Sequence, residues 1–488
     1  MMRQTLRNLA LLVGLLSVSG GTFAQLPGSD PLGLGIAPAN DSLEDIDTQA
    51  GLPSLTRLFV LALENDSELM RQRYESQATG QEVPMARAAL RPYVEAGASA
   101  IYQRADNIYT QNPGDYPSEV YEDRVSGTTH DTLWRIDITQ PLFSLERWRS
   151  VDKALAQADA ADLRVAVAER NLALSLVDAY LNAYLASRKL GLLDAKREAL
   201  NLQRHQAQRA YDLGIGDRIN LLEAQSRLDQ AVADQVKAEN ELANALSDLE
   251  RLTGRLPDFR GPALGNIERV SLEHEWENTQ QWLSRVDDNV EVRLAKQVYE
   301  VAQLDTDVRR AGHYPELNLS LGYRDLNSSD ELRTSEDVTA SLELDVPIYR
   351  GGYTSASIRQ GELTALASRE ALTNERRLAH QEVRKRLRNL QGNARQLEAL
   401  TRSIESSQLF LEAAIRGENL GLRDLVDVLD ARAELYDLRI QFVEVFCQYL
   451  GDRTYLEAAT GDLDTPDLIT IMSRLNEVSQ PDKTPSAA

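Results

Sequence analysis

The sequence predicts a mainly α-helical protein in which long coiled-coil helical hairpins carry two pairs of β-strands, whose alternation suits either a transmembrane β-barrel part or a half-buried soluble sheet. Three features of the 488 residues predict this class: an internal repeat of about 207 residues, two proline-free stretches of about 62 residues, and short segments of alternating apolar and polar residues. Charged residues make up 26% of the chain and aromatic residues 6%. That composition favours long helices over compact globules.

The first 24 residues have the pattern of a secretory signal peptide. Two arginines precede an apolar run at residues 9–18, and small residues occur up to Ala24. The run is too short to cross about 30 Å of hydrocarbon, so we expect cleavage after residue 24 and export of the mature chain. Residues 25–51 are rich in proline, glycine and acids, and we expect a flexible N-terminal segment there.

An internal duplication organises the rest of the chain. Pro141 corresponds to Pro347 at an offset of 206 residues, and Gly214 corresponds to Gly421 at an offset of 207. Such self-similarity marks a repeated structural unit. The predicted parts are a first repeat over 52–254, an equatorial linker over 255–272, a second repeat over 273–461 and a C-terminal tail over 462–488.

Each repeat contains a predicted pair of β-strands, within residues 93–141 and residues 316–347. In "VTASLELDV", from Val338 to Val346, apolar residues alternate with Thr, Ser, Glu and Asp, so one face is apolar and the other polar. Strands of about ten residues with this alternation are typical of transmembrane barrels. The residues alone give at least equal weight to a half-buried strand of a soluble sheet.

A helical segment precedes each strand pair, and a long helix follows it. The preceding segments cover residues 52–90 and 273–310, and the long helices cover residues 150–211 and 357–418. At 1.5 Å per residue, each long helix would extend about 90 Å. A single globular domain needs no helix of that length.

A return helix follows each long helix, over residues 217–254 and 424–461. In the first, apolar and small residues recur at alternating steps of three and four, as at Leu221, Ala224 and Leu228. This heptad spacing predicts coiled-coil packing, so each long helix and its return helix should form an antiparallel hairpin. The hairpin tips are predicted at residues 213–217 and 420–424.

Four strands cannot close into a membrane barrel. An open sheet edge in hydrocarbon leaves backbone groups unpaired at a cost of several kcal/mol each, and membrane barrels start at about eight strands. A membrane location therefore requires several copies of the chain. Symmetry allows a dimer with eight strands or a trimer with twelve.

The duplicated tips resemble those of the TolC-type outer membrane factor family. They read "YDLGIGDRINLLEAQSRL" and "ENLGLRDLVDVLDARAELYDL", and the repeats end in "LTG" and "ATG", so that the resemblance covers residues 52–461. It implies a homotrimer with one shared twelve-stranded barrel in the outer membrane and an α-barrel of helical hairpins in the periplasm. It also implies an exit duct for tripartite efflux or type I secretion, served by an inner-membrane pump and a periplasmic adaptor protein.

Each tip contains a glycine followed three residues later by an aspartate. Gly214 and Gly421 are expected to adopt positive φ where the long helices end. Asp217 and Asp424 are then expected to cap the return helices. The resemblance implies adaptor contact at four tip residues: Gly214, Ile215, Gly421 and Leu422.

Asp427 and Asp430 lie three residues apart and therefore share a helix face just after the second tip. From the residues alone, a solvated face with capping support and a functional acidic site weigh about equally. The resemblance implies that these acids ring the closed mouth of the duct. Six carboxylates in a trimer would create a field that attracts cations.

Arg423 matches a basic position that ties neighbouring helices at the entrance in the family. This chain departs from the family pattern nearby, because Asn220 is the equivalent of Asp427 in the first tip and Glu418 replaces a common aromatic residue. We therefore expect Arg423 to hold the gate by pairing with Glu418 or with an acid of the adjacent helix.

Other chemistry finds little support. The net charge of -22 argues against nucleic acid as a partner, because phosphate neutralisation needs a basic face. The five histidines and Cys447 show no metal-ligand spacing, and neither a phosphate-binding loop nor a catalytic triad can be argued. We expect no enzymatic activity, no metal and no cofactor.

The alternative function is that of a soluble periplasmic coiled-coil scaffold or adaptor-like binding protein. In that case the strands would form a small soluble sheet. The environment of their apolar face distinguishes the two functions.

Overall fold

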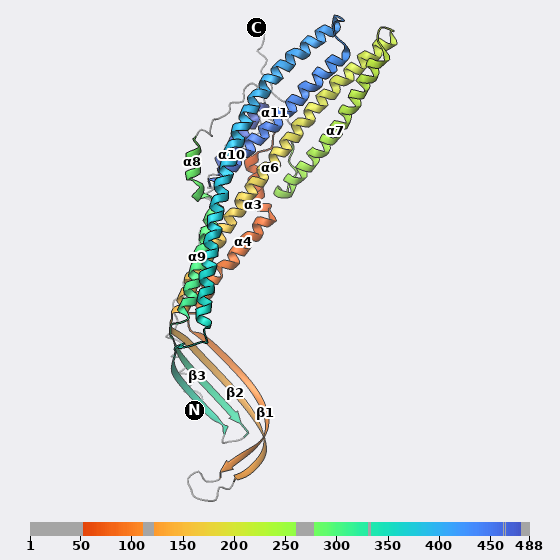
Figure 1. The fold of residues 1–488 in the computed structure, drawn as a ribbon. Helices are drawn as coiled ribbons and strands as arrows, with labels where there is room; N and C mark the ends of the chain where they lie inside the picture. The colour runs from red at the N-terminus through yellow and green to blue at the C-terminus, as the bar shows by residue number, and fades with distance from the viewer. Residues whose placement is uncertain are drawn as a thin grey trace. The chain divides into compact units, whose positions relative to one another are not determined.

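The computed structural model describes residues 52–110, 122–259, 278–329, 333–461, 463 and 465–479 (Figure 1). All of them belong to one compact unit, residues 39–488. The predicted signal peptide, the flexible N-terminal segment and most of the predicted linker lie outside the described residues.

Four antiparallel strands form one sheet in the order β1-β2-β3-β4 (Figure 1). Strands β1 (Tyr93–Thr110) and β2 (Glu122–Ser144) belong to the first repeat, and β3 (Glu316–Ser328) and β4 (Ser335–Asp345) to the second. The first two strands contain 18 and 23 residues, so the expected length of ten was wrong for them. Alternation reveals only the part of a strand that has two unlike faces, whereas backbone pairing continues further along this hairpin.

The sheet has one apolar face and one polar face. Ile138 of β2 lies opposite both Val94 of β1 and Leu321 of β3, and Leu321 lies opposite Ala340 of β4. Directly opposite residues point to the same side of a sheet, so the alternation in each strand produces two continuous faces. The apolar face includes Val94, Trp134, Ile136, Ile138, Leu317, Leu319, Leu321, Val338, Leu342 and Leu344.

Two long helices continue from the sheet, α6 (Leu145–Asp212) after β2 and α10 (Tyr353–Asn419) after β4. They contain 68 and 67 residues and begin slightly earlier than predicted. Helix α6 begins without a connecting loop because Ser144, the last residue of β2, caps it: Ser144 Oγ accepts a hydrogen bond from the backbone N–H of Arg147 at 3.3 Å.

The return helices are α7 (Arg218–Thr253) and α11 (Leu425–Ala459). Helix α7 packs against α6 and α11 packs against α10, which gives the two antiparallel hairpins that the heptad spacing predicted. Helix α11 buries larger side chains than α7, including Phe442 and Phe446. Helix α7 instead buries an alanine at every seventh position, which permits close helix approach: Ala224, Ala231, Ala238 and Ala245.

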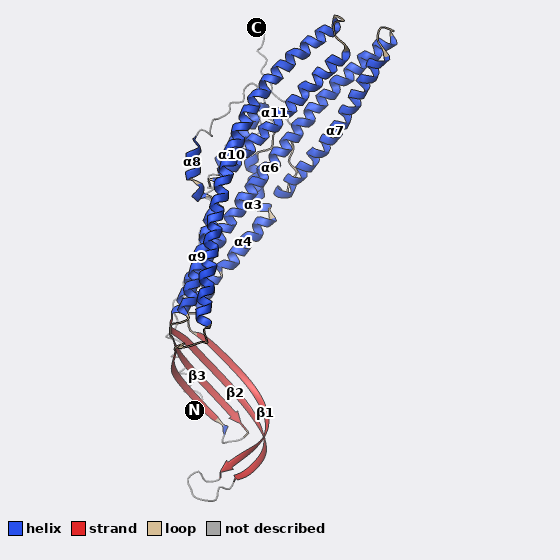
Figure 2. Cartoon of the chain, in the orientation of Figure 1, coloured by secondary structure: helices blue, strands red, loops and turns tan. Residues whose placement is uncertain are grey.

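Shorter helices pack against these hairpins (Figure 2). Helices α4 and α9 contact α6, and α9 also contacts α10. Across the described ranges, no helix combines the length and apolar character that crossing a membrane requires. The shorter elements are α3 (Leu55–Asn65), α4 (Ser67–Gly80), α5 (Glu82–Ala88), α8 (Thr279–Ser284), η4 (Val286–Asp288) and α9 (Val290–Ala311).

Part of the predicted C-terminal tail is helical. Helix α12 (Thr465–Ser479) contacts α3 and buries Leu468, Ile471, Met472 and Leu475. These residues recur at steps of three, one and three, which places them on one helix face. The predicted C-terminal tail thus contains a short amphipathic helix.

A buried carboxylate joins α10 and α11. The Asp452 side chain is 9% exposed and accepts hydrogen bonds from Arg386 at 2.7 Å, Asn389 at 3.2 Å and Asn393 at 3.0 Å. Asp452 stands at a heptad position that would ordinarily be apolar. Its three donors on α10 compensate for the loss of water around the charge.

The same network reaches α6 through Tyr455. The Arg386 guanidinium lies 4.0 Å from the centroid of the Tyr455 ring, and the Tyr455 hydroxyl donates a hydrogen bond to Asp178 of α6. Burial raises the pKa of Tyr455 to about 12 and also raises the pKa of Asp178. These contacts fix the packing of α6, α10 and α11 on one another.

We expect Asp452→Ala to lower the free energy of unfolding by about 3 kcal/mol, because it leaves a largely buried guanidinium without one of its carboxylate partners. Chemical denaturation of the detergent-extracted protein measures this change. Glu434→Ala, which removes an exposed acid from the same helix, is the matched control and should change the free energy by less than about 0.5 kcal/mol. Equal effects of the two substitutions would contradict the assignment.

Candidate functional site

The two hairpin tips are built alike because they repeat one sequence pattern. Gly214 follows α6 with φ of 73°, and Gly421 follows α10 with φ of 72°, as the sequence predicted. The chain then turns back on the end of the long helix: the backbone N–H of Gly216 donates to the carbonyl of Ala210 at 2.9 Å. Glycine adopts positive φ without the strain that a Cβ would add, so it allows this abrupt reversal.

The two predicted helix caps differ. Asp217 precedes α7, and its carboxylate accepts a hydrogen bond from the backbone N–H of Asn220 at 2.7 Å. Asp424 holds the same position before α11 but makes no side-chain cap hydrogen bond, so that part of the expectation was wrong. The backbone is extended at both positions, so backbone conformation does not account for the difference.

The tips expose large apolar side chains to solvent. Ile215 is 81% exposed and Leu422 is 79% exposed, and Leu213, Ile219 and Leu420 are exposed as well. Ile215 and Leu422 were two of the residues predicted to contact an adaptor. Apolar groups concentrated at both tips form a surface suited to contact with another protein.

Arg423, in the turn before α11, pairs with Asp427 in the first turn of α11 rather than with Glu418. Its Nη1 lies 3.4 Å from Asp427 Oδ2, and its guanidinium lies 5.6 Å from the centroid of the Phe410 ring. The aliphatic part of Arg423 covers Gly417, where an added Cβ would lie 2.9 Å from Arg423 Cγ. Because Phe410 and Gly417 both belong to α10, the arginine ties the second return helix to its own long helix.

Asp430 pairs with Arg227, a residue that sequence reasoning missed. Arg227 Nη2 lies 2.8 Å from Asp430 Oδ1, and Arg227 Nε lies 2.9 Å from Glu223 on its own helix. At the repeat offset of 207 residues, Glu223 is the equivalent of Asp430. A single arginine therefore holds the matching acids of both repeats, and its spacing of four from Glu223 was the available sequence signal.

This arrangement joins the two hairpins of one chain near their tips. The Arg227–Asp430 pair connects α7 to α11, and Lys196 of α6 adds a second connection to Asp437 of α11 at 3.2 Å. The Arg227 and Asp430 side chains are 40% and 58% exposed. Exposed pairs contribute about 0 to 1 kcal/mol, so this contact can hold a conformation and still break readily.

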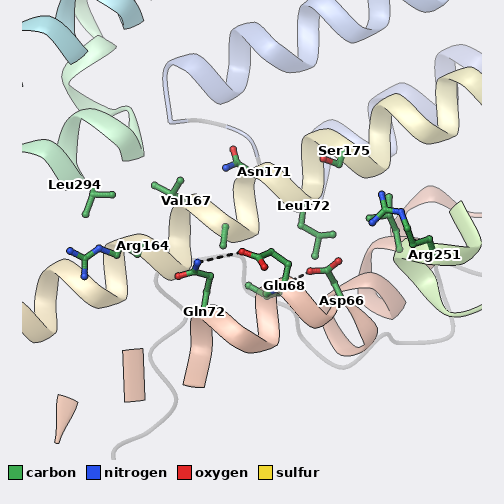
Figure 3. A pocket seen from close by; sticks show the side chains of 13 residues that line it. Asp66, Glu68, Gln72, Arg164, Val167, Asn171, Leu172, Ser175, Arg251 and Leu294 are labelled. Carbon is green, nitrogen blue, oxygen red and sulfur yellow. Dashed lines mark hydrogen bonds between the residues drawn. The ribbon is translucent and has the colours of Figure 1, made fainter. Parts of the chain in front are cut away.

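A pocket of about 380 Å³ lies between α4, α6 and the end of α7 (Figure 3). Its acids are engaged within α4: Asp66 accepts from the backbone N–H of Leu69 at 2.7 Å, and Glu68 accepts from Gln72 at 3.4 Å. The nearby Arg71 guanidinium holds the pKa of the Glu68 carboxyl below its usual range. These groups stabilise the helix start and form no arrangement for acid–base or nucleophilic chemistry.

Within the described residues, no cluster of His, Cys, Asp or Glu is placed to hold a metal ion. Cys447 is buried in α11, and burial raises the pKa of its thiol, which therefore stays protonated. It packs as a small apolar side chain.

These features define a class of protein. A sheet with one apolar face, continued by long hairpins whose tips expose apolar side chains and acids, is typical of a membrane channel with a long helical part. The sequence model of the outer membrane efflux protein family matches residues 58–255 and 286–462. The chain belongs to the outer membrane efflux protein family, a family of transport proteins of the outer membrane.

Curated relatives agree with this family over most of their length. The outer membrane protein TolC of Vibrio cholerae is 26% identical over 429 residues, which cover 86% of this chain and 94% of TolC. The proteases secretion protein PrtF of Dickeya chrysanthemi is 26% identical, with 84% of this chain and 88% of PrtF covered. The alkaline protease secretion protein AprF of Pseudomonas aeruginosa is 27% identical, with 84% of each chain covered.

Solved structures share the fold. A structure of CusC, described as a transmembrane channel, aligns with a TM-score of 0.71 and 17% identity, covering 88% of this chain and 95% of CusC. The outer membrane protein VceC of Vibrio cholerae aligns with a TM-score of 0.69 and 15% identity, covering 83% of this chain and 96% of VceC. The predicted fold class is thereby confirmed.

The two caps predict unequal effects of the same substitution. Asp217→Ala removes a hydrogen bond from the first turn of α7 and should destabilise that turn by about 1 kcal/mol. Asp424→Ala removes no such bond. Hydrogen exchange followed by mass spectrometry should show about fivefold faster exchange at residues 218–221 in Asp217→Ala, and a smaller change at residues 425–428 in Asp424→Ala. Equal acceleration in both tips would contradict the difference between the caps.

Proposed function

We propose that three copies of this chain form an exit duct through the outer membrane, which receives substrates from an inner-membrane pump through a periplasmic adaptor. The observation that carries this proposal is the sheet with two unlike faces and two unpaired edges. Membership of the outer membrane efflux protein family supports the location and the transport role. The family description supports efflux as a use of such a duct, and relatives named as protease secretion proteins support polypeptide secretion.

The sheet edges supply the argument for three copies. Among the described residues, β1 pairs only with β2 and β4 pairs only with β3. In hydrocarbon, each unpaired edge group costs several kcal/mol, so β1 of one copy must pair with β4 of the next until the sheet closes. Three copies give twelve strands, which leave a wider lumen than the eight strands of a dimer.

The apolar face is suited to lipid. Val338 is 81% exposed and Leu342 is 65% exposed in the single chain, which no packed soluble sheet would leave uncovered. Trp134 is exposed on the same face, and Trp148 at the start of α6 contacts Phe143 edge to face at 5.2 Å between ring centroids. Aromatic side chains at both ends of an apolar band are typical of the two membrane interfaces.

The hairpin tips form the docking end of the duct. A trimer would carry six tips, each with a glycine turn and exposed apolar side chains. Adaptor contact is assigned to Gly214, Ile215, Gly421 and Leu422, where the turn backbone is accessible and the side chains offer apolar area.

The acids near the second tip form the periplasmic mouth. Asp427 and Asp430 contribute six carboxylates in a trimer, and Arg423 and Arg227 hold them while the mouth is closed. Separation of the hairpins during opening would break the Arg227–Asp430 pair and release a carboxylate into the lumen. The local field would then favour cations more strongly than in the closed state.

We expect Leu342→Arg to destabilise the membrane-inserted protein by about 2 to 4 kcal/mol, because the charge would meet lipid near the midplane. Ser341→Arg introduces the same side chain on the polar face one residue away and should cost much less. Urea unfolding of protein inserted in lipid vesicles measures both. Similar costs for the two variants would contradict a lipid-facing apolar surface and favour the soluble scaffold.

We expect the double substitution Asp427→Asn, Asp430→Asn to lower the cation selectivity of the channel in a planar lipid bilayer, because it removes six carboxylates from the mouth. The reversal potential under a KCl gradient measures the change. Unaltered selectivity would show that both acids are only solvated side chains that support the start of the helix.

We expect Arg227→Gln to raise both the conductance and the cation selectivity, since it releases Asp430 and loosens the contact between the hairpins. Arg218→Gln makes the same charge change at an exposed position of the first tip and is the matched control. Equal single-channel currents and reversal potentials for the two variants would show that Arg227 has no special role.

A further inference from the structure

The polar face of the sheet carries its charges in rows. One row crosses all four strands: Gly97 of β1 lies opposite Arg135 of β2, Arg135 lies opposite Arg324 of β3, and Arg324 lies opposite Asp337 of β4. Two arginines of neighbouring strands thus stand side by side. Like charges at directly opposite positions destabilise a sheet. This placement therefore lowers the stability of the sheet unless a group of opposite charge lies between the two arginines.

Neither arginine is neutralised by a close partner. Arg135 Nε lies 3.9 Å from Asp137 Oδ2, and these side chains are 62% and 50% exposed, so the pair is weak. Among the described residues, Arg324 makes no ion pair within 4.0 Å, although Asp337 stands opposite it. The Asp337 carboxylate accepts a hydrogen bond from Ser335 Oγ at 3.0 Å instead. Guanidinium donors on both arginines therefore remain available.

Gly97 makes room for this arrangement. A Cβ at Gly97 would lie 2.9 Å from Arg135 Nε and 3.3 Å from Arg135 Cγ. The Arg135 side chain consequently lies across β1, away from Arg324. A separation of this kind lessens the repulsion between the two guanidinium groups and leaves space between them.

Acids flank the arginine row. Glu95 and Asp137 are directly opposite each other two residues along their strands from Gly97 and Arg135, on the side of the helices. With Asp337, three carboxylates lie beside two arginines, so net charge alone does not draw anions to this level of the sheet. Binding would depend on the planar fork of each guanidinium, which pairs with carboxylate or phosphate groups through two hydrogen bonds.

From these contacts we infer that Arg135 and Arg324 form an anion-binding ring inside the barrel. The inference rests on the proposed function, because only closure of three chains brings six arginines to one level of a lumen. The ring takes ligands with several carboxylate or phosphate groups, which span neighbouring arginines. Polyanionic small molecules and acidic segments of exported polypeptides have this chemistry. Monovalent anions gain too little to overcome the adjacent acids.

Block of the channel by inorganic tripolyphosphate tests the ring. Purified full-length protein is placed in a planar bilayer, and tripolyphosphate is added on the barrel side in KCl free of divalent cations. We expect concentration-dependent block of the wild-type current. In Arg135→Gln, Arg324→Gln the half-blocking concentration should rise at least about tenfold, which corresponds to about 1.4 kcal/mol of lost binding.

Two further variants separate a specific site from a general loss of charge or of folding. Arg135→Lys, Arg324→Lys keeps the charge but loses the paired donors, so its half-blocking concentration should lie between those of the wild type and the glutamine variant. Glu95→Gln, Asp137→Asn removes the adjacent acids and should strengthen the block. The inference would be overturned if tripolyphosphate did not block the wild-type channel. It would also be overturned if the half-blocking concentration were the same for the wild type and the glutamine variant. Absence of any channel in the wild type would instead overturn the proposed duct.

Discussion

The pairing of backbone groups at the two sheet edges is the constraint on which the rest of this structure depends. Strands β1 and β4 each have one edge whose N–H and C=O groups pair with no other strand in the part of the chain that the structure describes. In the proposed duct the apolar face places those edges in hydrocarbon, where water cannot satisfy them. Closure with other copies follows from that requirement. In the proposed trimer the long hairpins would line a second tube, because three copies of each strand pair bring three copies of each hairpin.

Duplication explains both the similarity of the two hairpins and their difference. Matching glycines close both tips with almost the same positive φ. The side chains around them have diverged: alanines fill the seam of α7, phenylalanines fill part of the seam of α11, and Asn220 stands where the second repeat has Asp427. The Arg227–Asp430 pair bridges the two repeats. Asp430 is thus restrained by Arg227 of the first hairpin, whereas Asp427 pairs with Arg423 of its own hairpin.

Much of the fold could be predicted from the sequence, because its signals are local and periodic. Proline-free heptads predicted the hairpins, the repeated glycines predicted the tips, and alternation at Val338 to Val346 predicted the two faces of β4. The contact of Arg227 with Asp430 spans 203 residues and depends on how two hairpins pack, which no local pattern reports. The arginine row was hidden for the same reason, since Arg135 and Arg324 become neighbours only through the register of β2 with β3. The absence of a side-chain cap hydrogen bond at Asp424 could not be predicted either, because the sequence pattern at the two tips is the same there.

The number of chains in the detergent-extracted protein tests the central claim most directly, because a sheet with two open edges is stable in a membrane only when it is shared. Native mass spectrometry of the protein, released from detergent micelles under conditions that preserve assemblies, gives this number. The shared twelve-stranded barrel predicts a single species of three chains. A folded single chain extracted from the outer membrane would contradict closure between copies, and a stable dimer would contradict the twelve-stranded barrel and every ring of residues inferred from it.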